Sequence, residues 1–391
     1  MMSGKTECRL LGMPDEGEFF LAWELSTWLT KREQSTQFLY DHARKGPTKR
    51  PFFLNVSLTH PHDPYAISEE LYGQYEGVEI PLPNVKIAQE EQDPHTKRLL
   101  NCIDLWDNPI PIEAVIRARR AYFGACTYVD NQVGRLLKVL KECKFDQNTI
   151  IIFSGDHGDM LGERNMWYKM SFFEMSARVP LLFHYPKRFQ PRRVQESVST
   201  MDLLPTLVEI IGGTVDPLTP IDGESLYPAL IGQSVKDEVF GEYMGEGTIS
   251  PVVMIRTGPW KYVTSLVDPP QLFNLVTDPQ ELTNLAGSQN EEIAAVEVGF
   301  AAQAKAKWDL KAIHDEVLQS QRQRRVVWSA LKQGRWESWD FEPPREGSMK
   351  YIRSMIPLDD LELRARYPPV DALGRAVKLN HPHGIADAQW Q

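Results

Sequence analysis

The sequence predicts an α/β protein in which helices sandwich a mainly parallel β-sheet, with a small antiparallel sheet and a helical tail towards the C-terminus. Two observations indicate this class. Short apolar runs of β-branched and aromatic residues recur along the first part of the chain, and amphipathic patterns of helical period separate them. The resulting order of strand, helix, strand, helix is typical of a parallel sheet covered by helices on both faces.

The N-terminal part is predicted to contain a helix, a strand and a long loop. Residues 15–43 carry apolar side chains at helical spacing, which predicts a helix. Residues 52–58 form a short apolar run, which predicts a strand. Residues 66–110 are polar, Pro-rich and irregular, so we expect a long loop there, and long loops in compact domains are often functional.

The central part predicts the main alternation of helices and strands. Residues 112–143 place apolar side chains three and four positions apart, which predicts an amphipathic helix packed on the sheet. Residues 150–154 and 178–185 predict buried strands. Residues 202–211 predict a helix that ends at Gly212, because glycine readily takes the left-handed conformation that follows a helix.

The pattern changes beyond residue 235. Residues 252–255 and 260–263 flank a turn that contains Gly258, and this predicts a hairpin. Residues 272–275 predict a further strand of the same antiparallel sheet. Residues 290–334 predict one long helix or two.

Composition and charge exclude several classes of partner. The net charge of −10 argues against nucleic acid and anionic membranes. No apolar run is long enough to span a bilayer, and the N-terminus has no apolar signal-peptide core. The four cysteines show no paired spacing, which favours reduced thiols, and we therefore expect a cytoplasmic protein.

The turn after the predicted strand at 150–154 carries the chemistry. Reactive groups in open α/β sheets gather beyond the carboxyl ends of strands. Asp156 and His157 are oxygen and nitrogen donors at such an end, and Gly158 lets the backbone approach an ion closely. Lys169 follows and suits an anionic substrate. The alternative for the Asp-His pair alone is a solvated turn with a helix cap.

Several segments together resemble a sulfatase of the alkaline-phosphatase superfamily, and specifically the choline-sulfatases. The most specific is the block Asp-His-Gly-Asp-Met-Leu-Gly-Glu-Arg that ends at Arg164, which is typical of formylglycine-type sulfatases and phosphonate hydrolases. The other segments are Thr59-His-Pro-His-Asp-Pro-Tyr65, Asp93-Pro-His95, Arg119-Arg-Ala-Tyr-Phe123, Ser176-Ala-Arg-Val-Pro180, Asp222-Gly223, Trp260-Lys-Tyr-Val263 and Asp278-Pro-Gln-Glu-Leu-Thr-Asn-Leu285. Residues 308–367 resemble the extra C-terminal segment of choline-sulfatases.

The chain departs from this family in its nucleophile. The resemblance implies a formylglycine made from the cysteine of a Cys-x-Pro-x-Arg motif. None of the four cysteines lies in that motif, and no Ser-x-Pro-x-Arg replaces it. The family's first strand, with its acidic metal ligands, is also expected to be missing. The chain therefore looks like a choline-sulfatase without its N-terminal portion, and we expect it to be inactive as written.

The resemblance assigns roles to the residues of the candidate site. Asp156 and His157 become ligands of a divalent metal, of which calcium is the usual one. Lys169 and His62 become the catalytic pair that grips the sulfate and protonates the leaving choline oxygen. His60 shares this role as a substrate-binding residue, or is a loop histidine bonded to backbone.

Substrate selectivity is assigned to Glu246. Choline has no hydrogen-bond donor on its nitrogen, so carboxylate charge and aromatic faces recognise it. The resemblance places Glu246 opposite the quaternary ammonium, and the alternative is an exposed loop glutamate, since Glu242 lies close by.

The resemblance also divides the chain into segments and functions. Residues 1–235 form part of a sulfatase catalytic domain, 236–290 a small antiparallel sheet region, and 291–391 a helix with a choline-sulfatase-type tail. We expect a homo-oligomer formed through that tail. The predicted reaction is hydrolysis of choline sulfate, a small-molecule sulfate ester. The alternatives are a non-catalytic sulfatase-like binding protein and a phosphonate or phosphate ester hydrolase of the same superfamily.

Overall fold

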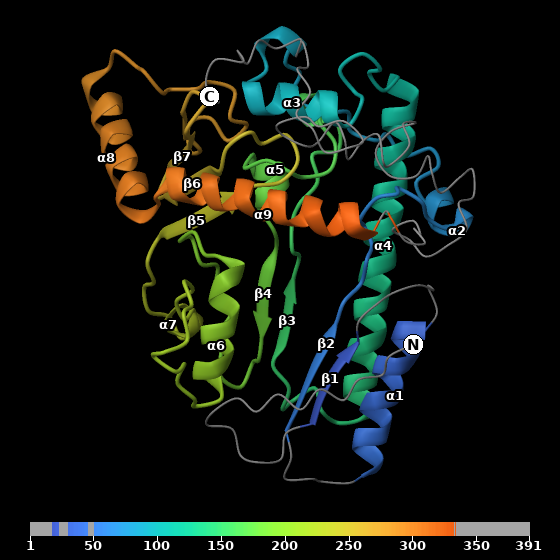
Figure 1. Cartoon of the computed structure of the whole chain (residues 1–391). Helices are drawn as coiled ribbons and strands as arrows, with labels where there is room; N and C mark the ends of the chain where they lie inside the picture. The colour runs from blue at the N-terminus through green and yellow to red at the C-terminus, as the bar shows by residue number, and fades with distance from the viewer. Residues whose placement is uncertain (1–17, 23–29, 46–50, 332, 334–391) are drawn as a thin grey trace. The chain divides into compact units, whose positions relative to one another are not determined.

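The computed structural model describes residues 18–22, 30–45, 51–331 and 333. The chain divides into two units, each assembled from separate segments of the sequence (Figure 1). Unit 1 consists of Met1–Ile80, Ile116–Asp156 and Pro180–Lys236, and unit 2 of Pro81–Val115, His157–Val179 and Asp237–Gln391. The predicted tail from residue 335, with its expected role in oligomerisation, lies outside the described residues.

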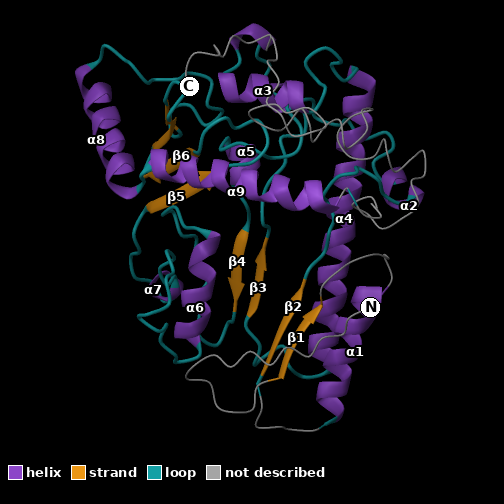
Figure 2. Cartoon of the chain, in the orientation of Figure 1, coloured by secondary structure: helices purple, strands orange, loops and turns teal. Residues whose placement is uncertain are grey.

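The β-strands of unit 1 form two pairs of opposite sense (Figure 2). Strand β1 (Glu18–Ala22) runs parallel to β2 (Phe52–Val56), and β3 (Ile151–Ser154) runs antiparallel to β4 (Leu181–His184). Of the two described pairs in unit 1, one is parallel, as expected for the predicted sheet, and the other is antiparallel. A parallel return requires a long crossover, usually a helix, whereas the β3–β4 connection holds only short helical turns.

The prediction of a helix over residues 15–43 is wrong for residues 18–22. Glu18–Ala22 is a strand, and helix α1 begins at Thr30 and ends at Arg44. A short apolar run such as Glu-Phe-Phe-Leu-Ala has no decisive periodicity of its own. Here the non-local pairing with β2 decides its conformation. The strand expected at 52–58 is confirmed as β2.

Two helices cover the apolar side of β2 and β3 in unit 1. The predicted amphipathic helix is confirmed as α4 (Ile112–Glu142). Its buried Val139 and Leu140 pack with Leu39 of α1 and with β-strand side chains. The remaining helices of this unit are α2 (Glu69–Gly73), the short η3 (Thr200–Asp202), α6 (Leu203–Ile210) and α7 (Tyr227–Leu230). Gly212, with φ of 81°, follows α6 as expected.

Unit 2 is built on a four-stranded antiparallel sheet in the order β5–β6–β7–β8. The strands are β5 (Glu238–Tyr243), β6 (Val252–Thr257), β7 (Trp260–Ser265) and β8 (Gln271–Asn274). The predicted hairpin is thus confirmed, with Gly258 at a φ of 55° in its turn. The C-terminal helical stretch forms two helices, α8 (Glu291–Lys307) and α9 (Leu310–Leu331), and α8 packs on the sheet.

The long loop expected over 66–110 contains helix α3 (Pro94–Cys102) in unit 2, which corrects that expectation. The local sequence explains the helix, because the Asp93 carboxylate accepts a hydrogen bond from the backbone N–H of Thr96 at 3.1 Å. Pro94 occupies the first turn, where it costs no hydrogen bond. Leu99 and Leu100 are 1% and 0% exposed and enter the core of unit 2. Short helices η1 (Gln89–Glu91), η2 (Glu163–Asn165) and α5 (Glu174–Ala177) complete the unit.

The sequence also led us to expect no membrane-spanning segment and reduced cysteine thiols. Among the described helices, none combines the length and the apolar character needed to cross a membrane. Cys102, Cys126 and Cys143 are described, and none of them is in a disulfide.

Candidate active site

The turn that follows β3 is shaped by a backbone contact that only glycine permits. The N–H of Gly158 donates to the carbonyl oxygen of Ser176 at 2.7 Å. A Cβ at this position would lie 2.0 Å from the carbonyl oxygen of Met175. His157 is therefore followed by a backbone fixed against the α5 segment, and its own orientation is constrained by that anchor.

The His157 ring is held in a defined tautomer. Its Nδ1 lies 2.8 Å from the carbonyl oxygen of Gly158, so Nδ1 carries the proton and donates it. In the neutral ring the lone pair is then on Nε2. Metal-binding histidines commonly donate their second nitrogen to a backbone carbonyl in this way. The preceding Asp156 is exposed.

The loop that carries Lys169 is closed by Asp159. The Asp159 carboxylate accepts hydrogen bonds from the N–H groups of Leu161 at 2.9 Å and Tyr168 at 3.2 Å. The N–H of Met160 donates to the carbonyl oxygen of Tyr168 at 2.6 Å, which ties the two ends of the loop together. Lys169 thus follows directly after a residue bound by two hydrogen bonds.

The same loop contains an unusual concentration of left-handed backbone. Non-glycine residues with positive φ are Leu161, Arg164, Asn165, Tyr168 and Met170. Such conformations cost on the order of 1 kcal/mol each and persist where the surroundings enforce them. Lys169 lies between two of these residues, Tyr168 and Met170, and its side chain is half-buried. The direction of the side chain is therefore set by tertiary contacts and not by the backbone conformation that the local sequence prefers.

Arg164 connects the loop that carries Lys169 to residues 280 and 281. Its guanidinium lies 3.9 Å from the centroid of the Phe173 ring and donates to the carbonyl oxygens of Gln280 and Glu281. Burial lowers the pKa of this arginine, and the negative charge of Glu281 opposes the shift. Arg164 therefore holds two loops together through backbone carbonyl oxygens.

A buried ionic cluster supports the adjoining segment. The Lys261 side chain is 1% exposed, and its Nζ lies 2.7 Å from both Glu174 and Glu281. Arg256 pairs with Glu174 at 2.9 Å. Burial alone would raise the pKa of Glu174, but the charges of Lys261 and Arg256 outweigh it and lower that pKa. Sequence analysis missed this cluster, although a lysine inside an apolar strand is its signal.

His60 and His62 follow β2 in unit 1, and their rings have different partners. The Nδ1 of His62 donates to Asp63, with 2.6 Å to the carbonyl oxygen and 3.1 Å to the carboxylate. This interaction places a proton on Nδ1 of His62. His60 packs on Tyr128 of α4 with ring centroids 4.9 Å apart. Burial lowers the pKa of His60, and a backbone hydrogen bond with Ala66 opposes the shift, so the neutral ring is favoured.

The two glutamates near the end of β5 have distinct partners. The Tyr243 hydroxyl donates to the Glu246 carboxylate at 3.0 Å. The Trp308 indole donates to the Glu242 carboxylate at 2.6 Å. The Glu242 carboxylate therefore binds Trp308, which follows helix α8, whereas the Glu246 carboxylate binds the hydroxyl of Tyr243.

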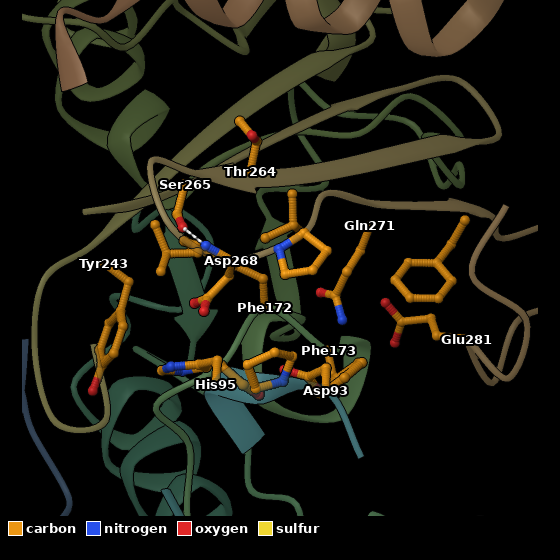
Figure 3. A pocket seen from close by; sticks show the side chains of 16 residues that line it. Asp93, His95, Phe172, Phe173, Tyr243, Thr264, Ser265, Asp268, Gln271 and Glu281 are labelled. Atoms are coloured by element: carbon orange, nitrogen blue, oxygen red, sulfur yellow. Dashed lines mark hydrogen bonds between the residues drawn. The ribbon is translucent and has the colours of Figure 1, made fainter. Parts of the chain in front are cut away.

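A pocket in unit 2 lies between α3 and the sheet. Figure 3 shows Tyr243, His95 and Asp268 among the side chains that face it. Asp268 forms a bidentate pair with Arg98, whose side chain is 4% exposed. The sequence analysis gave His95 no role of its own and named it only within the Asp93-Pro-His95 segment. Its position beside the Asp93 helix cap is the signal that could have given it a role.

The six predicted site residues fall into the two units. Asp156, His60 and His62 belong to unit 1. His157, Lys169 and Glu246 belong to unit 2. Their convergence into one site stays a prediction. Within the described part of the chain, no three His, Cys, Asp or Glu side chains are grouped so as to hold a metal ion.

Comparison with known proteins identifies the family. The family model for sulfatases matches residues 9–213, so the chain belongs to the sulfatase family. The model for the C-terminal part of choline sulfatase enzymes matches residues 315–367. The model for the C-terminal part of N-sulphoglucosamine sulphohydrolase matches residues 162–304.

Two individual relatives show which sulfatases the chain is similar to. The choline-sulfatase of Rhizobium meliloti (strain 1021) is 40% identical over 339 residues, which cover 85% of this chain and 66% of the relative. Arylsulfatase K of Gallus gallus is 31% identical over 267 residues, which cover 61% of this chain and 48% of the relative. The chain thus spans between about half and about two thirds of the length of these relatives. The expected similarity to choline-sulfatases is confirmed.

Solved structures confirm the α/β sulfatase fold. The phosphonate monoester hydrolase of Agrobacterium radiobacter matches with a TM-score of 0.58 and 27% identity, covering 74% of this chain and 63% of that one. A putative sulfatase from Bacteroides fragilis matches with a TM-score of 0.55 and 21% identity, covering 70% of this chain and 57% of that one.

Proposed function

We propose that this chain carries the choline-recognising and leaving-group side of a choline-sulfate hydrolase, a sulfuric ester hydrolase. The observation that carries this proposal is the 40% identity to the Rhizobium meliloti choline-sulfatase over 85% of the chain. The match of residues 315–367 to the choline sulfatase C-terminal model adds support.

The reaction places specific demands on the site. A sulfate monoester is an anion, and negative charge grows on the leaving oxygen as the S–O bond breaks. Lys169 offers a positive charge on a loop whose backbone is fixed by Asp159. His62 offers a ring whose Nδ1 is bound by Asp63, so Nε2 can deliver a proton to the leaving choline oxygen. His60 is proposed as a neighbouring sulfate contact in its neutral form.

Choline recognition is proposed for the Glu246 region. A quaternary ammonium is attracted by a carboxylate and by the face of an aromatic ring. Glu246 and Tyr243 present both groups within hydrogen-bond distance of each other. Glu242 in β5 is bound by the Trp308 indole, whereas the partner of Glu246 is the aromatic Tyr243, so Glu246 is proposed for the task.

A divalent cation, calcium in the first instance, is proposed at Asp156 and His157. The tautomer of His157 suits a ligand, since Nε2 carries the lone pair when Nδ1 donates to Gly158. Two side chains do not complete the shell of about six to eight oxygens that calcium takes. The described residues therefore do not form a whole metal centre, and no step of the reaction is assigned to the ion.

A chimera tests the proposal. The upstream part of the Rhizobium meliloti choline-sulfatase would be joined to this chain and produced together with a formylglycine-generating enzyme. We expect release of sulfate from choline sulfate, and a loss of about two or more orders of magnitude in Lys169→Ala and His62→Ala. A Glu246→Gln variant should lose its preference for choline sulfate over methyl sulfate, which has no ammonium group.

Two outcomes would contradict the proposal. Release of sulfate that is unaffected by Lys169→Ala and His62→Ala would remove both residues from the site. Faster turnover of a phosphonate monoester than of choline sulfate would favour the second candidate, a phosphonate hydrolase, which the structural match to the Agrobacterium radiobacter enzyme supports.

A further inference from the structure

His95 connects two loops that carry separate parts of the proposed site. Its Nε2 lies 2.7 Å from the carbonyl oxygen of Met170, the residue after Lys169. Its Nδ1 lies 3.3 Å from the carbonyl oxygen of Gly247, the residue after Glu246.

The two contacts set a requirement on the protons of the His95 ring if both are hydrogen bonds. Carbonyl oxygens accept hydrogen bonds and cannot donate them, so each ring nitrogen must supply a proton. Only the imidazolium form carries protons on both nitrogens. A neutral His95 would keep one of the two contacts and lose the other.

Neighbouring groups are compatible with a cationic ring. The Tyr243 ring meets His95 edge to face with centroids 5.8 Å apart. Carboxylates of Asp93 and Asp268 line the same pocket (Figure 3). Asp268 is already paired with Arg98. The segments that His95 contacts also carry Lys169 and Glu246, Glu281 lines the same pocket, and the Arg98 guanidinium binds the Gly247 carbonyl oxygen that His95 contacts.

Helix α3 provides a rigid base for this connection. Its Leu99 and Leu100 are buried in one core cluster with Met170. A Cβ on Gly247 would come within 2.8 Å of the Leu99 side chain, so the Gly247 loop lies directly on the helix. Arg98 adds a second bond to this loop, from Nε to the Gly247 carbonyl oxygen at 2.6 Å. Arg98 holds one loop, whereas His95 holds both.

We propose that His95 is a positioning residue that fixes the Lys169 loop and the Glu246 loop relative to each other by donating from both ring nitrogens. In a zwitterionic ester such as choline sulfate, a two-carbon linker limits the distance between the sulfate and the ammonium to a narrow range. His95 would match the spacing of the two loops to that distance. The meaning of this spacing rests on the proposed function, but the coupling itself is a property of the substrate-free chain.

Hydrogen exchange measured by mass spectrometry tests the coupling. Peptides covering residues 166–172 and 244–249 include the hydrogen-bonded amides of Tyr168 and Thr248. Exchange would be followed at about pH 5.5 and about pH 8, on either side of the range in which histidine normally titrates, and normalised to intrinsic rates. In the wild type we expect both peptides to lose protection together at the higher pH, by about tenfold for loss of a charge-assisted hydrogen bond.

Three variants separate positioning from general stability. His95→Gln should lower protection in both peptides at the lower pH and abolish the pH response. Arg98→Gln combined with Asp268→Asn should loosen the 244–249 peptide and leave the 166–172 peptide close to wild type. His184→Gln, at an exposed position of β4 in unit 1, should behave like the wild type.

Ring ¹⁵N shifts of histidine-labelled protein give an independent signature. We expect both nitrogens of His95, assigned by their loss in His95→Gln, to be protonated at the lower pH. Independent responses of the two peptides, an unchanged pH response in His95→Gln, or a single protonated ring nitrogen at low pH would each overturn the proposal. None of these results would affect the sulfatase assignment, which depends on turnover by the chimera.

Discussion

Replacing Lys261 by methionine should destabilise the protein strongly. The lysine side chain is 1% exposed and lies 2.7 Å from two carboxylates, of which Glu281 is 4% exposed and Glu174 is 17% exposed. Methionine fills a similar volume but leaves both carboxylates without this partner. Removing one member of a buried ion pair typically costs about 3–5 kcal/mol. Because Glu174 retains Arg256, we expect a loss of about 3 kcal/mol in the free energy of unfolding.

The pH dependence gives a second, signed test of the same reasoning. The pKa of Glu174 is lower in the folded protein than in the unfolded chain. Its contribution to stability is therefore present above the unfolded-state pKa, about 4.3 for glutamate, and is lost as the pH falls through the folded-state pKa. Lys261→Met removes part of this contribution. The difference in stability between wild type and variant should therefore shrink as the pH falls below about 4.

Urea denaturation followed by circular dichroism at several pH values measures both effects. Lys311→Met is a matched control, because Lys311 pairs with Asp315 on the surface and its side chain is 69% exposed. This control should change stability little. Adding Glu281→Gln to Lys261→Met should recover part of the loss by removing one unpaired buried charge. A loss below about 1 kcal/mol at neutral pH, or a difference that persists in acid, would refute the role of the cluster.

Three further predictions concern a backbone contact, an exposed apolar pair and the missing nucleophile motif. Gly158→Ala should cost about 1–3 kcal/mol, because its Cβ would meet the Met175 carbonyl oxygen at 2.0 Å, whereas Gly134→Ala, with nothing within 4 Å, should not destabilise. Phe153 and Leu182 are directly opposite each other on β3 and β4 and are 37% and 57% exposed, so a hydrophobic dye should bind, and Leu182→Ser should weaken its fluorescence. Purified by itself, the chain should release no detectable sulfate from choline sulfate, because its sequence has no cysteine in a Cys-x-Pro-x-Arg motif; metal-dependent turnover would show that another residue is the nucleophile.

Several elements follow from the sequence because their signals are local. The apolar periodicity of residues 112–143 predicted α4, since a helix presents one face at every third or fourth residue. The hairpin around Gly258 was predicted because its turn requires a positive φ. Asp156, His157 and Lys169 were proposed as site residues from their place after a strand and from family resemblance, and that assignment stays a prediction. That resemblance also predicted the sulfatase family, which the family models confirm.

Other features depend on contacts between distant residues, and only the tertiary structure decided them. Pairing with β2 makes Glu18–Ala22 a strand, although the periodicity of this short segment does not decide between strand and helix. The antiparallel sense of β3 and β4 is a property of their pairing and not of either strand. The partners of Lys261 and the two carbonyls bound by His95 are brought together from segments far apart in the chain. A periodic pattern reports which face of an element is buried, whereas the identity of the group that faces it is fixed only when the whole unit packs.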